Sequence, residues 1–192
     1  LDNPIDLFKK WFSKAKKTEI NDPNALALAT SDKTNQPNVR MVLLKGLSDK
    51  GFVFYTNFES RKGNELKNNQ KASMCFHWKS IRRQIRVIGK VEQVTDKEAD
   101  EYFNSRPYKN RIGAWASSQS KVLDKRENFL KKIKEFEKKY PDEKKVPRPP
   151  HWSGWRVLPT EIEFWLDVEG RVHERLNYKN DHGKWTKELL YP

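Results

Sequence analysis

One stretch near the end of the sequence combines cationic, imidazole and aromatic side chains at regular spacing. Glu163-Phe164-Trp165 is followed, after five residues, by Arg171-Val172-His173-Glu174-Arg175. We predict a strand over residues 172–178, and alternate side chains of a strand point to the same face. Arg171, His173 and Arg175 then form a face suited to a polar, planar, anionic ligand. His173 is the candidate proton donor or acceptor, because imidazole titrates near neutral pH.

Two further groups of polar residues flank predicted strands. Tyr55-Thr56 precedes Ser60-Arg61-Lys62, which opens a predicted short helix over residues 60–69. A helix N-terminus presents free N–H groups and a partial positive charge, so this group suits a phosphate. The alternative is that Ser60 only caps the helix and the basic residues are exposed.

Arg40 and Lys45 flank the apolar run 41–44. Their odd spacing puts them on opposite faces of a regular strand. Either a bulge lies between them or they serve different ligands.

Strands at short intervals must position these groups, and helices flank them. We predict strands over residues 25–31, 39–44, 51–56, 72–78 and 84–94, and again over 155–158, 161–167, 172–178 and 184–191. We predict longer helices over 4–17, with Asn3 as cap and Pro4 at its first position, and over 96–105 and 123–140. The fold class is therefore mainly β with flanking helices (α+β), built on an antiparallel barrel or sandwich. The 192 residues favour one domain, with a helical insert over about 96–140 and C-terminal strands over about 155–191.

The composition limits the kinds of partner that we expect the protein to bind. The formal net charge is +13, which fits either a well-hydrated surface or an anionic partner. The sequence has no apolar run long enough to span a bilayer, so we expect no membrane partner. Cys75 is the only cysteine, so we expect a cytoplasmic location and a buried strand thiol beside Met74 and Phe76. We expect no metal site.

The motifs lie within a longer pattern. Glu163-Phe164-Trp165, the five-residue spacer and Arg171-Val172-His173-Glu174-Arg175 together resemble the signature of the pyridoxamine 5'-phosphate oxidase family. Further blocks resemble the family in the same order, at residues 40–45, 54–57, 60–62, 83–84, 102–107, 112–115 and 118–120. The similarity covers nearly the whole chain from Asn3-Pro4 onward.

The resemblance implies a split β-barrel homodimer with FMN at the subunit interface. It implies oxidation of pyridoxamine 5'-phosphate and pyridoxine 5'-phosphate to pyridoxal 5'-phosphate, with O2 reduced to H2O2. The residues implied in FMN binding, some of them from the partner subunit, are Arg40, Met41, Val42, Leu43, Tyr55, Thr56, Ser60, Arg61, Lys62, Gln84, Gln119, Ser120, Trp165 and Arg175. Those implied in substrate binding are Lys45, Tyr102, Arg106, Asn110, Arg171 and His173, the last two also as catalytic residues.

The sequence departs from the family pattern at two positions. Leu166 stands where the family usually has Gln, and Asn110 stands where it usually has Ser. The family also carries an N-terminal segment that helps cover the active site, and the sequence given does not include it. The sequence also lacks an initiator Met, so we expect it to be trimmed at its front. These departures bear on substrate affinity and rate more than on reaction type.

Two alternatives remain at this point. One is a related split-barrel flavoprotein or vitamer-binding protein without turnover, which Leu166 and Asn110 would explain. The other is a basic nucleic-acid-binding module that uses Lys and Arg for phosphates and aromatic rings for base stacking. The aromatic residues mostly fall at the spacing of residues that form a hydrophobic core. We therefore expect no nucleic-acid partner.

Overall fold

A computed structural model of the protein describes residues 2–192, and Leu1 of the predicted single domain lies outside them. The strands are β1 Ala25–Ser31, β2 Pro37–Leu43, β3 Gly46–Ser48, β4 Gly51–Asn57, β5 Lys71–Trp78, β6 Arg83–Gln93, β7 Trp152–Leu166, β8 Glu174–Asp181 and β9 Lys184–Leu190. The α-helices are α1 Pro4–Thr18, α2 Arg61–Asn68, α3 Asp96–Ser105, α4 Tyr108–Ala116 and α5 Arg126–Lys139. Short 3-10 turns occur at Lys79–Ile81, Glu143–Lys145 and Glu169–Arg171.

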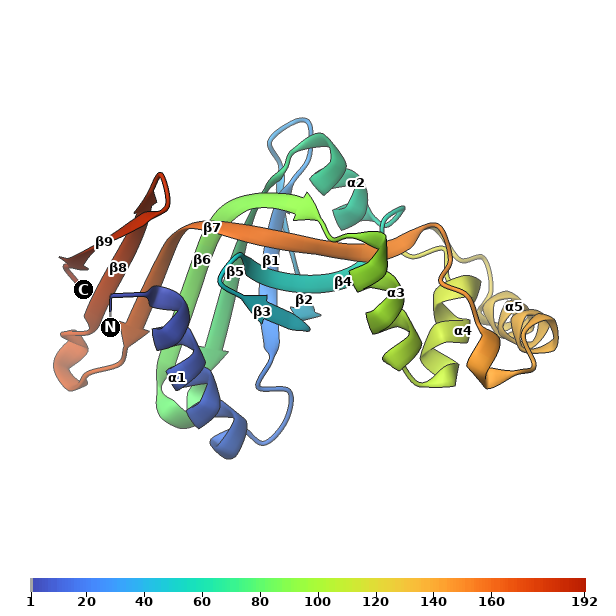
Figure 1. The fold of residues 1–192 in the computed structure, drawn as a ribbon, viewed down its shortest axis with the longest axis horizontal. Coiled ribbons are helices and arrows are strands. Elements are labelled where there is room, and N and C mark those ends of the chain that lie inside the picture. The colour runs from blue at the N-terminus through green and yellow to red at the C-terminus, as the bar shows by residue number, and fades with distance from the viewer. Residues whose placement is uncertain (1) are drawn as a thin grey trace.

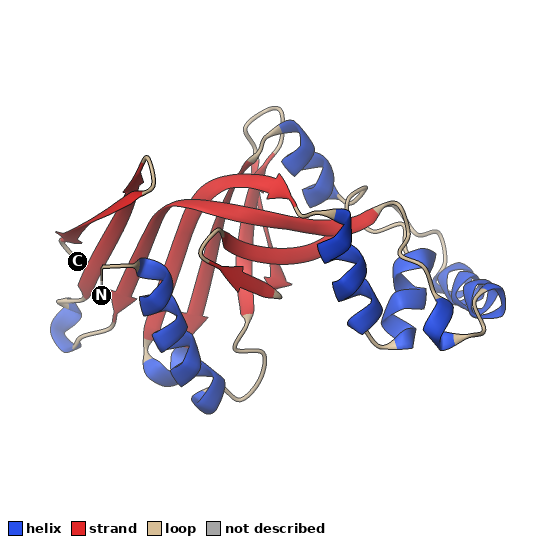
Figure 2. Ribbon diagram, viewed as in Figure 1, coloured by secondary structure: helices blue, strands red, loops and turns tan. Residues whose placement is uncertain are grey.

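The strands form one antiparallel sheet in the order β2-β1-β5-β6-β7-β4-β3, and β8 and β9 continue from β7. The sheet curls into a half-barrel with α1 and α2 along its sides (Figure 2). Helices α3, α4 and α5 gather at one end of the molecule, and the β8–β9 hairpin lies at the other (Figure 1). The predicted fold class, an antiparallel split β-barrel with flanking helices, is confirmed.

The long strand β7 joins the two ends of the sheet. Two strands were expected, over 155–158 and 161–167, but one continuous strand pairs first with β4 and then with β8. Its register with β6 shifts between Ile88 and Gly89, where Thr160 forms a bulge, and a bulge bends a strand. A Cβ at Gly89 would lie 2.1 Å from the carbonyl oxygen of Leu158, so this bend requires glycine.

The main core packs helix α1 against the sheet. Asn3 caps α1, its Oδ1 accepting from the Ile5 N–H at 2.8 Å, as predicted. Phe8 on this helix is fully buried, with its ring centroid 5.0 Å from those of Phe52 and Phe76. Burying each such side chain stabilises the fold by about 1.5–3 kcal/mol, so α1 is held firmly against the sheet.

A second core joins α3, α4 and α5. Phe103, Ile112, Val146 and Trp152 are buried there. The predicted helix over 123–140 begins at Arg126 instead, and Leu123 and Leu130 are exposed rather than on its packed side. Only its later residues, Ile133, Phe136 and Tyr140, pack onto this core.

The strand predicted over 172–178 is wrong at its start. β8 begins at Glu174, because the turn after β7 extends further than its sequence suggests. Gly170 has φ +74° and Arg171 has φ +62°, both in the left-handed region that a strand does not use. Arg171 and His173 therefore precede the strand, and the predicted alternating face of Arg171, His173 and Arg175 does not form.

Candidate active site

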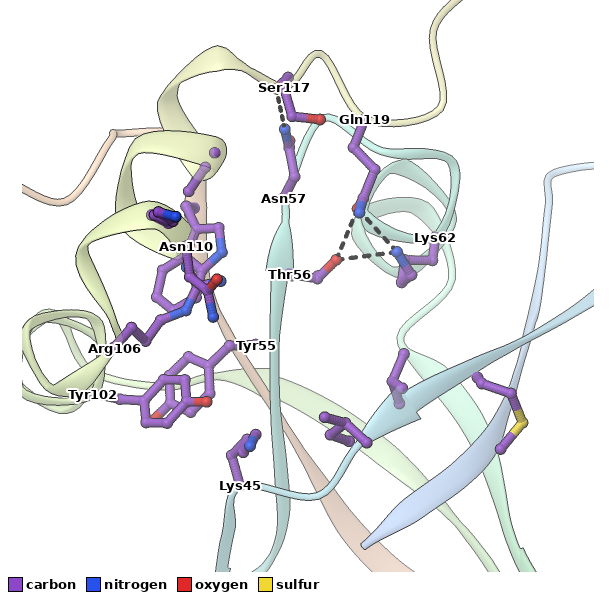
Figure 3. Close-up of a pocket in the computed structure, with 17 residues that line it drawn as sticks. Lys45, Tyr55, Thr56, Asn57, Lys62, Tyr102, Arg106, Asn110, Ser117 and Gln119 are labelled. Atoms are coloured by element: carbon purple, nitrogen blue, oxygen red, sulfur yellow. Dashed lines mark hydrogen bonds between the residues drawn. The ribbon is translucent and has the colours of Figure 1, made fainter. Parts of the chain in front are cut away.

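A cavity of about 480 Å³ lies between β2, β4, α2 and the helices α3 and α4 (Figure 3). The residues predicted from sequence that line it are Met41, Val42, Leu43, Lys45, Tyr55, Thr56, Lys62, Tyr102, Arg106, Asn110 and Gln119. Sequence reasoning missed other lining residues, namely Asn57, Lys109, Gly113, Ala114, Ser117 and Trp152. The cavity thus brings together residues from four separate segments of the chain.

Lys62 lies at the centre of one wall. Its Nζ donates to Thr56 Oγ1 at 3.1 Å and to Gln119 Oε1 at 3.0 Å, as Figure 3 shows. Burial, reinforced by the positive charge of Arg40 and only partly offset by Glu65, lowers the pKa of Lys62 to about 8. A buried cation with a lowered pKa favours an anionic partner, because a negative charge would restore its protonated form.

Ser60 caps the helix that carries Lys62. Its Oγ accepts from the Gly63 N–H at 3.2 Å. The capping role of Ser60 is therefore correct. The alternative also required exposed basic residues, whereas Lys62 is buried and only Arg61 is exposed.

A second cavity of about 440 Å³ adjoins the first and shares Met41, Lys62 and Gln119 with it. Its other lining residues are Asn38, Val39, Arg40, Arg61 and Ser120.

Glu65 organises the cations of this second cavity. Its carboxylate pairs with Arg40 at 3.3 Å and with Arg61 at 3.2 Å. Burial opposes its ionisation, but hydrogen bonds from Thr30 and Arg61 and the charge of Arg40 outweigh burial and lower its pKa.

Arg40 and Lys45 line different cavities. β2 is regular through Arg40 and ends at Leu43, before it reaches Lys45. The Lys45 N–H donates to the Val53 carbonyl at 2.8 Å, which turns the chain away from the strand. The odd spacing of Arg40 and Lys45 therefore needs no bulge. Arg40 lies within β2, whereas Lys45 lies beyond the end of that strand.

The far wall of the first cavity carries aromatic rings and a buried guanidinium. The rings of Tyr55 and Tyr102 stack at 4.1 Å, and Arg106 lies 4.7 Å from the ring of Trp152. Arg106 Nη1 is buried and has no hydrogen-bond partner among residues 2–192. Burial, followed by the charge of Arg111, lowers the pKa of Arg106. An unpaired buried N–H group is costly, so this position favours an anionic ligand.

Arg111 was not predicted from sequence. It is buried on α4, and its Nε also has no hydrogen-bond partner within the described residues. The sequence did not indicate that Arg111 is buried, because a basic residue in a short helix more often faces solvent.

The remaining predicted residues lie elsewhere. Gln84, Trp165 and Arg175 are neighbours across β6, β7 and β8, because Gln84 pairs with Trp165 and Trp165 pairs with Arg175. Arg171 and His173 lie in the turn before β8. This end of the sheet lies opposite α3 and α4 in Figure 1, so one chain does not bring these five residues to either cavity.

Ion pairs with the buried carboxylate of Glu163 fix Arg175 of this second group. Arg175 Nε lies 3.0 Å from Glu163 Oε1, and Arg86 Nη2 lies 2.6 Å from Glu163 Oε2. Burial opposes ionisation of Glu163, but hydrogen bonds from Arg175 and Arg86 outweigh it and lower its pKa. His173 is not part of the hydrophobic core and packs against the Trp165 ring at 4.6 Å.

The two departures from the family pattern fall in different surroundings. Asn110 lines the first cavity, on the side of Arg106 (Figure 3). Leu166 instead lines a third cavity of about 510 Å³, together with Leu7, Trp11, Phe164 and three more leucines, and with His173, Glu174 and Arg175. Most residues of this cavity are apolar, which suits the Leu166 side chain, but the cavity also brings Leu166 together with the predicted site residues His173 and Arg175.

Three further features concern the thiol, metal ligands and helix lengths of residues 2–192. Cys75 lies in β5 and is half-buried rather than fully buried, and burial raises the pKa of its thiol. No group of three or more His, Cys, Asp or Glu side chains in this range is placed to hold a metal ion. None of its helices is both long and apolar enough to cross a membrane.

Two family models match the chain. Residues 12–140 match the model described as pyridoxamine 5'-phosphate oxidase. Residues 152–192 match the model described as the pyridoxine 5'-phosphate oxidase C-terminal dimerisation region, which supports a homodimer.

Relatives extend the similarity to nearly the full length. A pyridoxine/pyridoxamine 5'-phosphate oxidase of Pelagibacter ubique is 62% identical over 191 residues, covering 99% of this chain and 92% of the relative. The protein of the same name from Agrobacterium fabrum is 53% identical over 193 residues, covering 100% and 93%.

Solved structures are also similar to this chain. PhzG from Burkholderia lata 383, in complex with tetrahydrophenazine-1-carboxylic acid, matches with a TM-score of 0.94 at 32% identity, covering 100% of this chain and 94% of that one. An FMN binding protein related to pyridoxamine 5'-phosphate oxidase, from Nostoc punctiforme, shares the fold with a TM-score of 0.77 at 16% identity, covering 97% of this chain and 96% of that one. The predicted resemblance is confirmed, and the chain belongs to the pyridoxamine 5'-phosphate oxidase family.

Proposed function

We propose that this chain is an FMN-dependent oxidase that converts pyridoxamine 5'-phosphate and pyridoxine 5'-phosphate to pyridoxal 5'-phosphate, with O2 as acceptor and H2O2 as product. Relatives 53% and 62% identical over nearly the whole chain are named pyridoxine/pyridoxamine 5'-phosphate oxidase, which supports this reaction. The observation that carries the proposal is the pair of adjoining cationic cavities. They offer places for two phosphorylated ligands side by side.

The smaller cavity fits the phosphate of FMN. Arg40, Arg61 and Lys62 line it, and Glu65 is the one carboxylate that pairs with these arginines among residues 2–192. An arginine fork matches phosphate geometry, and a lysine supplies a point charge. When bound, FMN supplies the redox chemistry by accepting two electrons from the substrate and passing them to O2. The residues proposed to hold it from this subunit are Arg40, Met41, Val42, Leu43, Tyr55, Thr56, Ser60, Arg61, Lys62, Gln119 and Ser120.

The larger cavity fits the phosphate of the vitamer. Arg106 has a buried, unpaired N–H, and Lys45 and Asn110 line the same space. Tyr102 is fixed by its stacking on Tyr55. We assign substrate-phosphate binding to Lys45, Tyr102, Arg106 and Asn110. The amide of Asn110 keeps a hydrogen-bond donor at the position where the family usually has Ser.

The partner subunit completes each site in this proposal. Trp165, Arg171, His173 and Arg175 belong to the segment that matches the dimerisation region, and they lie away from both cavities of their own chain. We propose that these residues and Gln84 reach the cavities of the other copy. Arg171 and His173 then lie beside the substrate ring as catalytic residues, and Gln84, Trp165 and Arg175 contact FMN.

The overall reaction differs between the two substrates. The amine consumes O2 and water and yields the aldehyde, ammonia and H2O2. The alcohol consumes O2 and yields the aldehyde and H2O2. In both cases the protein binds and orients the reactants and stabilises charge around the reacting carbon.

We further propose that the chain forms a single domain and works in the cytoplasm. One continuous sheet, from β2 to β9, supports the single domain. The presence of one cysteine fits a reducing compartment.

One spectroscopic experiment tests the proposal. The purified protein should be yellow, and pyridoxamine 5'-phosphate should bleach its flavin absorbance in the absence of O2. Unphosphorylated pyridoxamine is the matched control and should bleach it only at much higher concentration. Colour without bleaching would instead indicate a flavoprotein without this activity. A colourless protein that retains RNA or DNA in a salt-sensitive way would indicate the nucleic-acid module.

A further inference from the structure

The first cavity carries one more positive charge than the proposed function uses. Its four cationic residues are Lys45, Lys62, Arg106 and Lys109, and none of the 17 described residues that line it is Asp or Glu. Lys62 is assigned to FMN, and Lys45 and Arg106 are assigned to the vitamer phosphate. Lys109 remains without a role.

Helix α4 presents Lys109 to this cavity. The residues of the helix that line the cavity are Lys109, Asn110, Gly113 and Ala114. With 3.6 residues per turn, these four positions fall on one face of the helix. In Figure 3, Asn110 of this face lies on the side of the cavity that carries Arg106. Lys109 therefore belongs to the wall proposed to hold the vitamer phosphate.

Tyr108 and Arg111 are not part of that face. Tyr108 packs onto the second core, and its Oη donates to the Tyr140 carbonyl at 2.9 Å. Arg111 is buried and does not line the cavity. The first turn of α4 thus offers two side chains to a ligand, the ammonium of Lys109 and the amide of Asn110.

The ammonium of Lys109 is available to a ligand. It is exposed and forms no ion pair, hydrogen bond or ring contact among residues 2–192. By contrast, Lys97 on α3 pairs with Glu101 at 4.0 Å. A Cβ at Gly113, one turn further along α4, would meet no heavy atom outside its own helix within 4 Å. The space beside Lys109 is therefore open.

The phosphate of the vitamer can use a further charged donor. A phosphate monoester presents three strong acceptor oxygens and a charge of about −1.5 to −2 at neutral pH. Lys45 and Arg106 are charged donors, whereas Asn110 is a neutral one. A hydrogen bond from a charged donor is roughly twice as strong as one from a neutral donor. Lys109 has three N–H donors on a flexible side chain, so it can complete this set.

We propose that Lys109 is a further substrate-binding residue, whose ammonium donates to the vitamer phosphate and strengthens the preference for phosphorylated over unphosphorylated substrates. This inference rests on the proposed function, in which the first cavity holds the substrate. It deepens that function because it adds a cation beside Asn110, which stands where the family usually has Ser.

Binding is measured without turnover by isothermal titration calorimetry of pyridoxamine 5'-phosphate into the purified protein, with its FMN kept reduced and O2 excluded. Lys109→Met should weaken the Kd by about three- to tenfold, less than a buried charged hydrogen bond would give, because water screens an exposed lysine. Lys109→Arg should remain close to the wild type because it keeps the positive charge. Lys132→Met is the matched control and should keep the wild-type Kd, because it removes the same charge from an exposed position on α5 that lines neither cationic cavity.

Steady-state assays of H2O2 release then separate phosphate recognition from reaction. In Lys109→Met, KM for pyridoxamine 5'-phosphate should rise by a similar factor with kcat unchanged, and kcat/KM for unphosphorylated pyridoxamine should stay as in the wild type. An unchanged Kd in Lys109→Met, equal weakening in Lys132→Met, or equal losses with both substrates would overturn the inference. Weaker binding in Lys109→Met alone, in a protein without turnover, would instead support the inference and refute the proposed function.

Discussion

Lys62 should make FMN affinity depend on pH in a way that one substitution removes. The free protein holds the pKa of this lysine at about 8, through burial first and the charge of Arg40 second. A bound phosphate dianion would favour the ammonium form and raise that pKa again. Binding therefore takes up a proton whenever the pH lies above the pKa of the free protein, and affinity must fall as the pH rises.

The size of the effect follows from the protonated fraction. Between about pH 7 and about pH 9, the fraction of charged Lys62 in the free protein falls from about nine-tenths to about one-tenth, so the Kd for FMN should weaken about tenfold. In Lys62→Met this slope should disappear. At about pH 7 the variant should also bind FMN about ten- to a hundredfold more weakly, because a hydrogen bond to a charged group contributes about 1.5–3 kcal/mol.

The assay is the quenching of flavin fluorescence as FMN is titrated into apoprotein at each pH. Lys67→Met is the matched control, because it removes the same charge from an exposed position on the same helix. It should keep the wild-type affinity and slope. Retention of the pH slope in Lys62→Met, or equally weakened FMN binding in Lys67→Met, would refute this role of Lys62.

Three further predictions concern other parts of the site. Arg106→Ala should raise KM for pyridoxamine 5'-phosphate by about ten- to a hundredfold, and much less for unphosphorylated pyridoxamine, in steady-state assays of H2O2 release. Arg171→Ala should lower kcat while the absorbance spectrum still shows bound FMN, and full activity in this variant would refute the proposed substrate face. Glu65 has a lowered pKa, so its contribution to stability is present above the ordinary carboxyl pKa of 4.5 and is lost as the pH falls through its folded-state pKa. Glu65→Gln should therefore unfold in urea with a free energy about 3 kcal/mol lower at neutral pH and with a smaller loss on acidification, and equal acid sensitivity of the two proteins would contradict this.

The sequence predicts elements well where a local signal marks their ends. Helix α3 begins and ends where expected, because Thr95 and Glu98 form a capping box at its start. Helix α4 was missed, because Pro107 precedes it without any side-chain cap. Strand β3 was missed because it has only three residues. The start of β8 was predicted wrongly. We expected the turn to end at Gly170, but Arg171 also has a positive φ, so the turn is longer.

The site depends on contacts that local patterns do not contain. Thr56 and Lys62 meet Gln119, which lies far along the chain on the segment after α4. Spacing alone cannot predict that meeting, and only the resemblance to a family placed Gln119 in the site. Arg111 was not predicted because its unpaired Nε is buried only in the folded chain.

The central claim is that each site takes its cationic cavity from one subunit and His173 from the other. Arg106→Ala and His173→Ala each disable one contribution. A mixed dimer of the two variants would then contain one site with both defects and one intact site. Random pairing makes about half of the dimers mixed. At a substrate concentration far below the KM of Arg106→Ala, where each variant alone has little activity, dissociating and reassociating equal amounts of the two should therefore restore about a quarter of wild-type activity. If the mixture stays no more active than the separate variants, the two residues belong to the same subunit's site, and the shared site is wrong.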